Sequence, residues 1–341
     1  MTEAGPARAS AALDVRNTGD AGLRDRLASA KAAYVTRRID PGGATSLLSE
    51  GVRPKDGDLL LARVESIGQH RRLELTSGRR ATLHVGDEIL VCYGSRYAPD
   101  QFEAYLPDDL GACDLVAAGG IASTAVNRHT RIKKATRILP IGIVADRSGK
   151  AVNLRQFSIP RTEVPHLETP VITVVGSSMN AGKTTTAAAL IRGFLSRGQH
   201  VAAAKVTGTG AGGDRWTMLD AGARTVLDFS DAGAPSTFGL DAREIESIFL
   251  ALLSELGRAR PDVIVLEVAD GLCQRETAEL VRSNIFKSHI DGVFFAGADA
   301  LGSAAGVRFL EESGVDVLGI SGAVTASPLA IRELEAMVSV P

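Results

Sequence analysis

The sequence has few cysteines, and their spacing gives no pairs. Cys92, Cys113 and Cys273 lie far apart and form no CxxC motif. This argues against both a disulfide framework and a zinc site built on paired cysteines, and it is typical of a protein in a reducing compartment. We therefore expect a cytoplasmic protein.

Long apolar segments and an excess of one charge are lacking as well. No segment approaches the length needed to span a bilayer, and the first twenty residues lack the apolar stretch of a secretory signal. The net charge of −2 gives no electrostatic basis for binding nucleic acid or an acidic membrane surface. We expect neither of these partners.

Lysine is scarce compared with arginine. It occurs eight times among 38 Lys and Arg residues, so the other 30 are arginine. An ammonium group is a compact point charge that suits phosphate oxygens in a tight loop. Of the three lysines after residue 160, Lys183 and Lys205 fall inside the motifs described below.

The length of the chain indicates two domains. At 341 residues it is longer than one typical core requires. We expect a disordered tail over 1–22, a β-rich N-terminal domain over 23–157, a proline-containing linker over 158–170 and a second domain over 171–341.

The N-terminal domain begins with a predicted helix over 23–35. From residue 58 to 107, short runs rich in Leu, Val and Ile are separated by glycines. Ser77-Gly78 and Gly86-Asp87 are suited to hairpin turns, and this spacing of strands is typical of a small antiparallel barrel or sandwich. A further extended stretch continues the β-rich unit to Leu154.

The second domain alternates short apolar runs with helical patterns. Strands are predicted at 171–175, 200–206, 262–268, 292–296 and 315–321. Helices are predicted between them: at 183–197, from a capping box at Asp241 to Leu256, and after Ser327-Pro328. This alternation predicts the α/β class, as a doubly wound, mostly parallel sheet with helices on both faces, preceded by the smaller β-rich domain.

The segment GSSMNAGKTTT (176–186) follows the first of these strands and opens the next helix. It matches GxxxxGK[ST] except that its first glycine is Gly176, one residue before the usual position at Ser177. A glycine-rich turn, helix N-terminal N–H groups, a lysine and a hydroxyl together bind phosphate. Lys183 would reach the β- and γ-phosphate oxygens, and Thr184 would supply a ligand to Mg²⁺. An ordinary strand–turn–helix corner is the alternative.

This P-loop is expected to bind a nucleotide through the residues of the loop and of the first helical turn. They are Gly176, Ser177, Ser178, Met179, Asn180, Ala181, Gly182, Lys183, Thr184 and Thr185. No NKxD or TKxD motif follows a strand, so the carboxylate that usually reads guanine is missing. The sequence therefore predicts ATP rather than GTP.

Two further side chains lie where open α/β sheets bind their ligands, at the carboxyl ends of strands. Glu267 ends the apolar run VIVLE and could hold Mg²⁺ through water or accept a substrate proton; a solvated strand end is the alternative. Lys205 ends another buried strand, where a phosphate or substrate role explains it best. Asp270, in the loop after Glu267, is a weaker candidate.

The G-x₅-G-K-T loop resembles that of dethiobiotin synthetase and its relatives in the signal-recognition/MinD-like branch of P-loop proteins. The resemblance extends over 168–341 as ordered features and includes AAAKVTGTG, VIVLEVADG and the later strand–LG–helix–strand run. It implies that Lys205 lies beside the substrate and the γ-phosphate. It also implies that Asp214, or alternatively Asp220, binds Mg²⁺ and that Glu267 is the second carboxylate near the metal. Asp214 is suited to capping a helix as well.

Two other resemblances are more limited. SSMNAGKT is similar to the loop of bacterial thymidine kinase, but that family needs a zinc ribbon and this chain has no CxxC pairs. GTGAGGD and DAGARTVLDF, followed by VIVLEVADG, resemble the nucleotide-binding half of the D-glutamate N-acetyltransferase family. The early loop lysine of MinD-type dimerising ATPases is absent.

The predicted function is ATP-dependent, Mg²⁺-requiring phosphoryl transfer to a small molecule, as in a kinase or a phosphate-activating synthetase. Lys183, Lys205 and Glu267 are the predicted catalytic residues. The substrate could be anionic, because 127–137 is basic, although such a run is also typical of a solvated face. A homodimer is left open. The alternative is an ATP-driven regulatory or assembly protein without a small-molecule acceptor.

Overall fold

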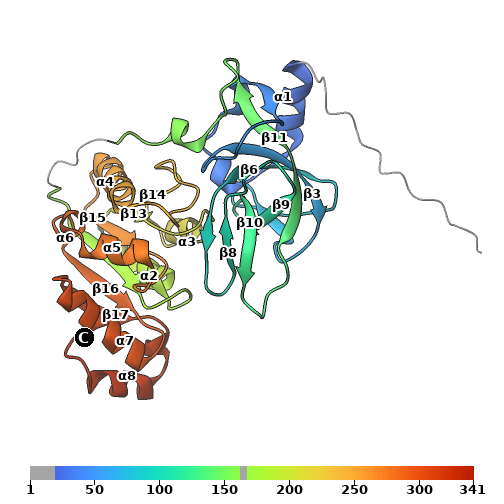
Figure 1. Ribbon diagram of the computed structural model, residues 1–341. Helices are drawn as coiled ribbons and strands as arrows, with labels where there is room; N and C mark the ends of the chain where they lie inside the picture. The colour runs from blue at the N-terminus through green and yellow to red at the C-terminus, as the bar shows by residue number, and fades with distance from the viewer. Residues whose placement is uncertain (1–19, 162–166) are drawn as a thin grey trace, which may run out of the picture.

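The computed structural model describes residues 20–161 and 167–341 (Figure 1). Its strands form a nine-stranded sheet in the first half of the chain, a separate two-stranded hairpin and a six-stranded sheet in the second half. The predicted tail lies outside the described residues except for 20–22, which begin a helix, and 162–166 of the predicted linker lie outside them too. In the part of the chain that is described, no helix is long and apolar enough to cross a membrane.

The nine-stranded sheet closes on itself. Its strands are β1 (Lys31–Ala32), β2 (Ala44–Leu48), β3 (Leu59–Ser66), β6 (Glu88–Tyr93), β7 (Arg96–Tyr97), β8 (Phe102–Tyr105), β9 (Cys113–Ala117), β10 (Ile121–Arg128) and β11 (Thr136–Asp146). The path β6-β3-β11-β9-β10 returns to β6, so these five strands form a barrel. Four of the five pairings are antiparallel and the closing pair, β10 with β6, is parallel, which differs from the antiparallel arrangement that the turns predict.

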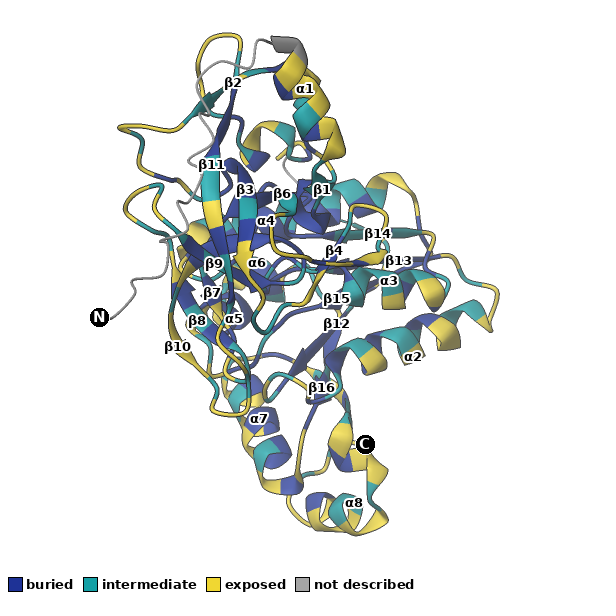
Figure 2. Cartoon of the chain, turned by 90° about the vertical axis from the view of Figure 1, so that its right-hand side faces the viewer, coloured by how far each residue is buried: buried dark blue, intermediate teal, exposed yellow. Residues whose placement is uncertain are grey.

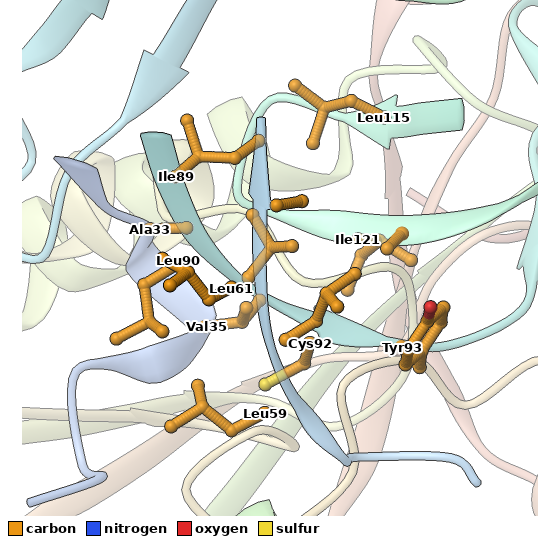
Figure 3. Packing of buried hydrophobic residues seen from close by; sticks show 14 of the residues in the cluster. Ala33, Val35, Leu59, Leu61, Ile89, Leu90, Cys92, Tyr93, Leu115 and Ile121 are labelled. Carbon is orange, nitrogen blue, oxygen red and sulfur yellow. The ribbon is translucent and has the colours of Figure 1, made fainter. Parts of the chain in front are cut away.

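Apolar side chains from several strands fill the barrel. Figure 3 shows Leu59 and Leu61 of β3 beside Cys92 of β6 and Ile121 of β10, and all four are fully buried. Full burial of a large apolar side chain contributes about 1.5–3 kcal/mol each. Cys92 therefore belongs to the core and is remote from solvent.

The predicted helix over 23–35 is wrong in its second half. The helix α1 spans Asp20–Ser29 and is followed by β1 and a 3₁₀ turn, Tyr34–Thr36. The amide of Ala33 donates to the carbonyl of Leu90, so pairing with β6 captures this segment. Tyr34 is fully buried. Tertiary contacts thus override the local helical preference.

One of the two predicted hairpin turns is correct. Strands β4 (Arg72–Glu74) and β5 (Arg80–Thr82) form an antiparallel hairpin around Ser77-Gly78, where Gly78 has a φ of 84°. Gly86-Asp87 lies between β5 and β6 but does not form a hairpin turn, because these two strands do not pair. The amide of Gly86 donates to the carbonyl of Val64, and the chain then pairs with β3.

The second sheet is parallel throughout. Its strands are β12 (Val171–Gly176), β13 (Val201–Lys205), β14 (Thr225–Asp228), β15 (Val263–Glu267), β16 (Gly292–Ala296) and β17 (Val317–Ser321). They lie in the order β14-β13-β15-β12-β16-β17, and every pairing is parallel. The short edge strand β14 was not expected from the sequence. The strand β12, which precedes the P-loop, lies directly beside β15.

Helices cover both faces of this sheet. They are α2 (Lys183–Leu195), α3 (Gly213–Asp220), α4 (Ala242–Arg258), α5 (Arg275–Arg282), α6 (Asn284–Lys287), α7 (Ala300–Glu312) and α8 (Pro328–Glu335). Successive strand residues point to opposite faces: Val174 packs with residues of α2 and α3, and Val175 with residues of α4 to α7. Figure 2 shows buried residues along one side of α2 and exposed ones along the other. The fold is the predicted doubly wound α/β class.

The caps of two helices follow the sequence patterns. Asp241 accepts the amide of Glu244 at the start of α4, and Ser327 accepts that of Ala330 at the start of α8. The end of α4 differs from the prediction, because the helix continues through Gly257 to Arg258. A Cβ on Gly257 would meet the side chain of Leu167 at 2.7 Å, so this glycine permits close packing instead of ending the helix.

The barrel and the second sheet meet at α3 (Figure 1). The buried carboxylate of Glu74 accepts hydrogen bonds from the amide of Gly212 (2.9 Å) and from Trp216 Nε1 (2.6 Å). Trp216 is the only tryptophan in the sequence. Backbone also meets backbone, because a Cβ on Gly119 would lie 2.2 Å from the carbonyl oxygen of Gly210. The two halves are therefore packed against each other.

A buried charge cluster also crosses this boundary. Arg37 contacts Asp228 at 3.1 Å and Asp231 at 2.6 Å, and the hydroxyl of Tyr34 donates to Asp228. Burial alone would raise the pKa of Asp228, but Arg37, Ser230, Tyr34 and Arg215 outweigh it and lower that pKa to about 2. Arg37 is the cation that both carboxylates share, and Arg215 contacts Asp231 as well, at 3.2 Å.

We expect Arg37→Met to lower the free energy of unfolding by about 3–5 kcal/mol, because it leaves two buried carboxylates without that counter-charge. In the variant the pKa of Asp228 rises towards the acid form, so the defect should shrink as pH falls from 7 to about 4. Urea denaturation at both pH values measures this. The neighbouring Arg38→Met is the matched control, since Arg38 is exposed and lies farther away, 3.7 Å from Asp231. Equal losses in both variants, or a defect that ignores pH, would contradict the assignment.

Candidate functional site

The P-loop runs from the end of β12 into α2. Asn180 has a φ of 61° and Gly182, the N-cap of α2, a φ of 105°. Lys183 is buried, and its ammonium donates to the carbonyl of Ser178 at 2.8 Å. The lysine thus lies across its own loop, where a phosphate oxygen could replace the carbonyl.

The displaced glycine of the motif has a structural reason. A Cβ on Gly176 would lie 2.8 Å from the carbonyl oxygen of Ala296 and 2.8 Å from Cγ of Lys183. Real Cβ atoms do not approach other atoms so closely, and neither the backbone of β16 nor the packed lysine stem can easily move away. Gly176 is therefore required where the stem of Lys183 crosses the end of β12.

Two carboxylates meet the hydroxyl of Thr184. This hydroxyl lies 2.8 Å from Oδ1 of Asp214, to which it donates, and 3.2 Å from Oε1 of Glu267. Asp214 also forms an ion pair with Lys205. Glu267 reaches this position because β15 lies beside β12, and Asp214 because it is in the first turn of α3. The structure thus brings together four of the predicted site residues.

These side chains line one cavity of about 350 Å³. Its walls are Met179, Asn180, Gly182, Lys183, Thr184, Thr185, Lys205, Asp214, Glu267, Ala269 and Asp270. Asp270, the weaker candidate from the sequence, is therefore part of the site. Asp220 is not: it is exposed at the far end of α3.

Burial dominates the electrostatics of the cavity. It raises the pKa of Glu267 to about 7, with the charge of Asp214 adding to the effect. Burial also lowers the pKa of Lys183 and raises that of Asp270. For Lys205 and Asp214 their mutual attraction outweighs burial, so the pKa of Lys205 rises and that of Asp214 falls.

The residues fit a hydrated Mg²⁺ ion. Oε2 of Glu267 is buried and has no hydrogen-bond partner, so one lone-pair face is free for a cation or its water. Among residues 20–161 and 167–341, no three His, Cys, Asp or Glu side chains cluster as a complete metal site. Mg²⁺ does not need one, because it keeps several waters and takes few carboxylates together with substrate phosphates. Thr184, Asp214 and Glu267 would hold it.

The barrel contributes to the site in a way that the sequence could not indicate. The side-chain amide of Asn180 donates to Asp100 at 2.7 Å, so the loop after β7 contacts the P-loop directly. Asp228 and Asp231 do not line the cavity and lie in the buried cluster with Arg37. No local pattern links residue 100 to residue 180.

Comparison with known proteins gives limited similarity. No protein-family model matches the chain, and no curated protein matches it. Among solved structures, the signal recognition particle receptor FtsY from Elizabethkingia anophelis is 18% identical over 50% of this chain and 59% of its own (TM-score 0.32). FtsY from Thermotoga maritima is 20% identical over 55% and 64% (TM-score 0.35). The kinase domain of Escherichia coli tyrosine kinase ETK is 13% identical over 46% and 69% (TM-score 0.35).

We expect Gly176→Ala to lower the free energy of unfolding by about 1–3 kcal/mol, because the added methyl group must displace β16 or the stem of Lys183. The matched control is Gly193→Ala within α2, where a Cβ meets nothing within 4 Å. That substitution should stabilise the protein by about 0.4–1 kcal/mol. Urea denaturation of both variants measures the difference. A neutral or stabilising effect of Gly176→Ala would show that Lys183 is not held as described.

Proposed function

We propose that the protein binds ATP with Mg²⁺ in the 350 Å³ cavity and transfers the γ-phosphoryl group to a small molecule. The observation that supports this is the convergence of Lys183, Thr184, Asp214 and Glu267 at the end of the P-loop strand. The proposal follows the resemblance of the loop, Lys205 and Glu267 to the dethiobiotin synthetase branch of P-loop proteins.

The charge of the cavity supports a nucleotide that arrives with a divalent cation. Two ammonium groups face three carboxylates, so above the pKa of Glu267, about 7, the formal charge of the cavity is 2 − 3 = −1. A free polyphosphate would be repelled by this surplus, whereas its Mg²⁺ complex carries much less negative charge. When bound, Mg²⁺ neutralises charge between the β- and γ-phosphates.

Lys183 and Lys205 take different parts in the proposed reaction. Lys183 is buried, and burial lowers its pKa, so exchange of the Ser178 carbonyl for a phosphate oxygen would stabilise its charged form. Lys205 is held by Asp214 at the end of β13 and would orient the acceptor or the γ-phosphate. The bond from the γ-phosphorus to ADP breaks, and a new bond forms to an acceptor oxygen. A hydroxyl acceptor, whose proton would pass to a carboxylate of the cavity, would make the protein a kinase. A carboxylate acceptor would make it a synthetase that forms an acyl phosphate.

A regulatory ATPase is the second candidate, and the contact between Asn180 and Asp100 favours it. Through this hydrogen bond, a movement of the P-loop upon nucleotide binding would be transmitted to the loop after β7. ATP hydrolysis distinguishes the two functions: an enzyme should turn over faster with a metabolite acceptor, whereas a regulatory ATPase should respond to a protein partner.

We expect ATP with Mg²⁺ to stabilise the protein by about 2.7 kcal/mol at 100 times Kd, and Lys183→Ala to abolish this gain. GTP should bind more weakly, because no guanine-reading motif is present. Thermal unfolding with each nucleotide measures both. Lys287→Ala, outside the cavity, is the control and should respond as the wild type does. A full shift in Lys183→Ala would rule out the P-loop as the binding site.

We expect Glu267→Gln to lower kcat at least about tenfold with little change in the KM for nucleotide, because the amide keeps the shape but weakens the contact that positions the metal. ATP turnover, measured as ADP release, checks this. Asp220→Asn removes the other implied metal carboxylate and should leave kcat unchanged, since Asp220 is exposed outside the cavity. A variant Glu267→Gln with the kcat of the wild type would make Glu267 a structural residue.

A further inference from the structure

A second cavity, of about 510 Å³, lies on the barrel side of α3. It is lined by Gln69, His70, Arg71, Arg72, Arg80, Thr82 and Ala118. None of these residues lines the cavity of the P-loop. Three arginines in one concave site suit anionic groups, because a guanidinium can bind phosphate or carboxylate through two parallel hydrogen bonds.

The register of the hairpin places two of these arginines, Arg72 and Arg80, on the same face. Arg72 pairs with Thr82, and Glu74 with Arg80. Residues opposite each other in a hairpin share a face, as do residues two apart in one strand. Leu73, on the other face, is fully buried in the barrel core. The alternation of the hairpin therefore places Arg72 and Arg80 on one face as diagonal neighbours.

These arginines form no ion pairs in the described part of the chain. Within 20–161 and 167–341, no carboxylate forms an ion pair with Arg71, Arg72 or Arg80. Glu74 is directly opposite Arg80, but its two oxygens accept from Gly212 and Trp216 instead. Three arginines against this one carboxylate leave an excess of positive charge that a ligand could meet.

The backbone that carries the site is anchored. The carboxylate of Glu74 ties the hairpin to α3, and the turn at Gly78 packs on the indole of Trp216, to which a Cβ there would come within 2.7 Å. A site held in place loses less entropy when a ligand binds. Because Trp216 touches the hairpin, its fluorescence reports on events there.

We propose that this cavity, the arginine hairpin site, binds a small molecule that carries phosphate or several carboxylate groups. Its volume lies in the range of small-molecule sites, roughly 300–1,000 Å³. No Phe, Tyr or Trp lines it, and the net charge of the chain is −2, so a nucleic acid lacks both a stacking surface and a wider positive field. The site does not depend on the proposed ATP chemistry.

Titration of the full-length protein with citrate and with inorganic pyrophosphate tests this proposal. Trp216 fluorescence and calorimetry are the readouts, without Mg²⁺ and at constant ionic strength. We expect saturable binding at millimolar or lower concentrations, weakened at least about tenfold in the double variant Arg72→Gln/Arg80→Gln. Lys183→Ala should retain it, which separates this site from the P-loop.

The matched control is Arg308→Gln/Arg332→Gln, which removes the same charge from two exposed positions of the second domain and should bind both anions as the wild type does. Equal weakening in the two double variants would mean that only the net charge matters. Undiminished binding in Arg72→Gln/Arg80→Gln, binding lost in Lys183→Ala, or no saturable binding of either anion would each overturn the proposal. Tighter binding of a single-stranded RNA oligonucleotide than of pyrophosphate would overturn it as well.

Discussion

The ion pair of Lys205 with Asp214 connects the parts of the second domain that the candidate site needs. Lys205 ends β13, and in register it lies between Asp228 of β14 and Glu267 of β15. The pair is partly buried, and removing one partner would leave the other charge without compensation. The start of α3 is therefore held against the edge of the sheet, with Asp214 beside Thr184.

The same helix extends this constraint to the barrel. The amide of Gly212, at the N-cap of α3, and the indole of Trp216, one turn later, both donate to Glu74. The hairpin that carries Glu74 is thus fixed to the element that positions Asp214. Small residues allow the close approach, since Gly119 and Gly210 bring the two backbones into contact. The barrel is therefore packed directly against the second domain, through α3 and the loop before it.

Most of the second domain could be predicted from the sequence because its signals are local. The P-loop, the apolar strands and the caps at Asp241 and Ser327 each depend on a few consecutive residues, and the structure shows these elements. The edge strand β14 has only four residues, too few for a clear pattern. The sequence left Asp214 and Asp220 as alternative ligands of Mg²⁺. Six residues of helix separate them by about 9 Å. Only Asp214, in the first turn of α3, lies beside Thr184.

The barrel and its contacts were harder to predict, because they depend on residues far apart in the chain. Tyr34 belongs to a segment with helical character, but pairing with β6 and the contact with Asp228 determine its conformation. Gly86-Asp87 has the local sequence of a hairpin turn, but the strand that follows it, β6, pairs with β3. The contact of Asp100 with Asn180 requires both domains to be in place.

The strand order has a consequence for how the chain folds. The strand β12, which precedes the P-loop, is central in its sheet, and its neighbours β15 and β16 are synthesised much later. Val171 pairs with Ile264, and Ile172 with Gly292. Parallel pairings between such distant segments form slowly, because the loop-closure entropy must be lost first. The barrel strands, by contrast, are all synthesised by Asp146. During translation the barrel can therefore fold first. Its surface is then in place when α3 packs against it, before the later strands of the second sheet have been synthesised.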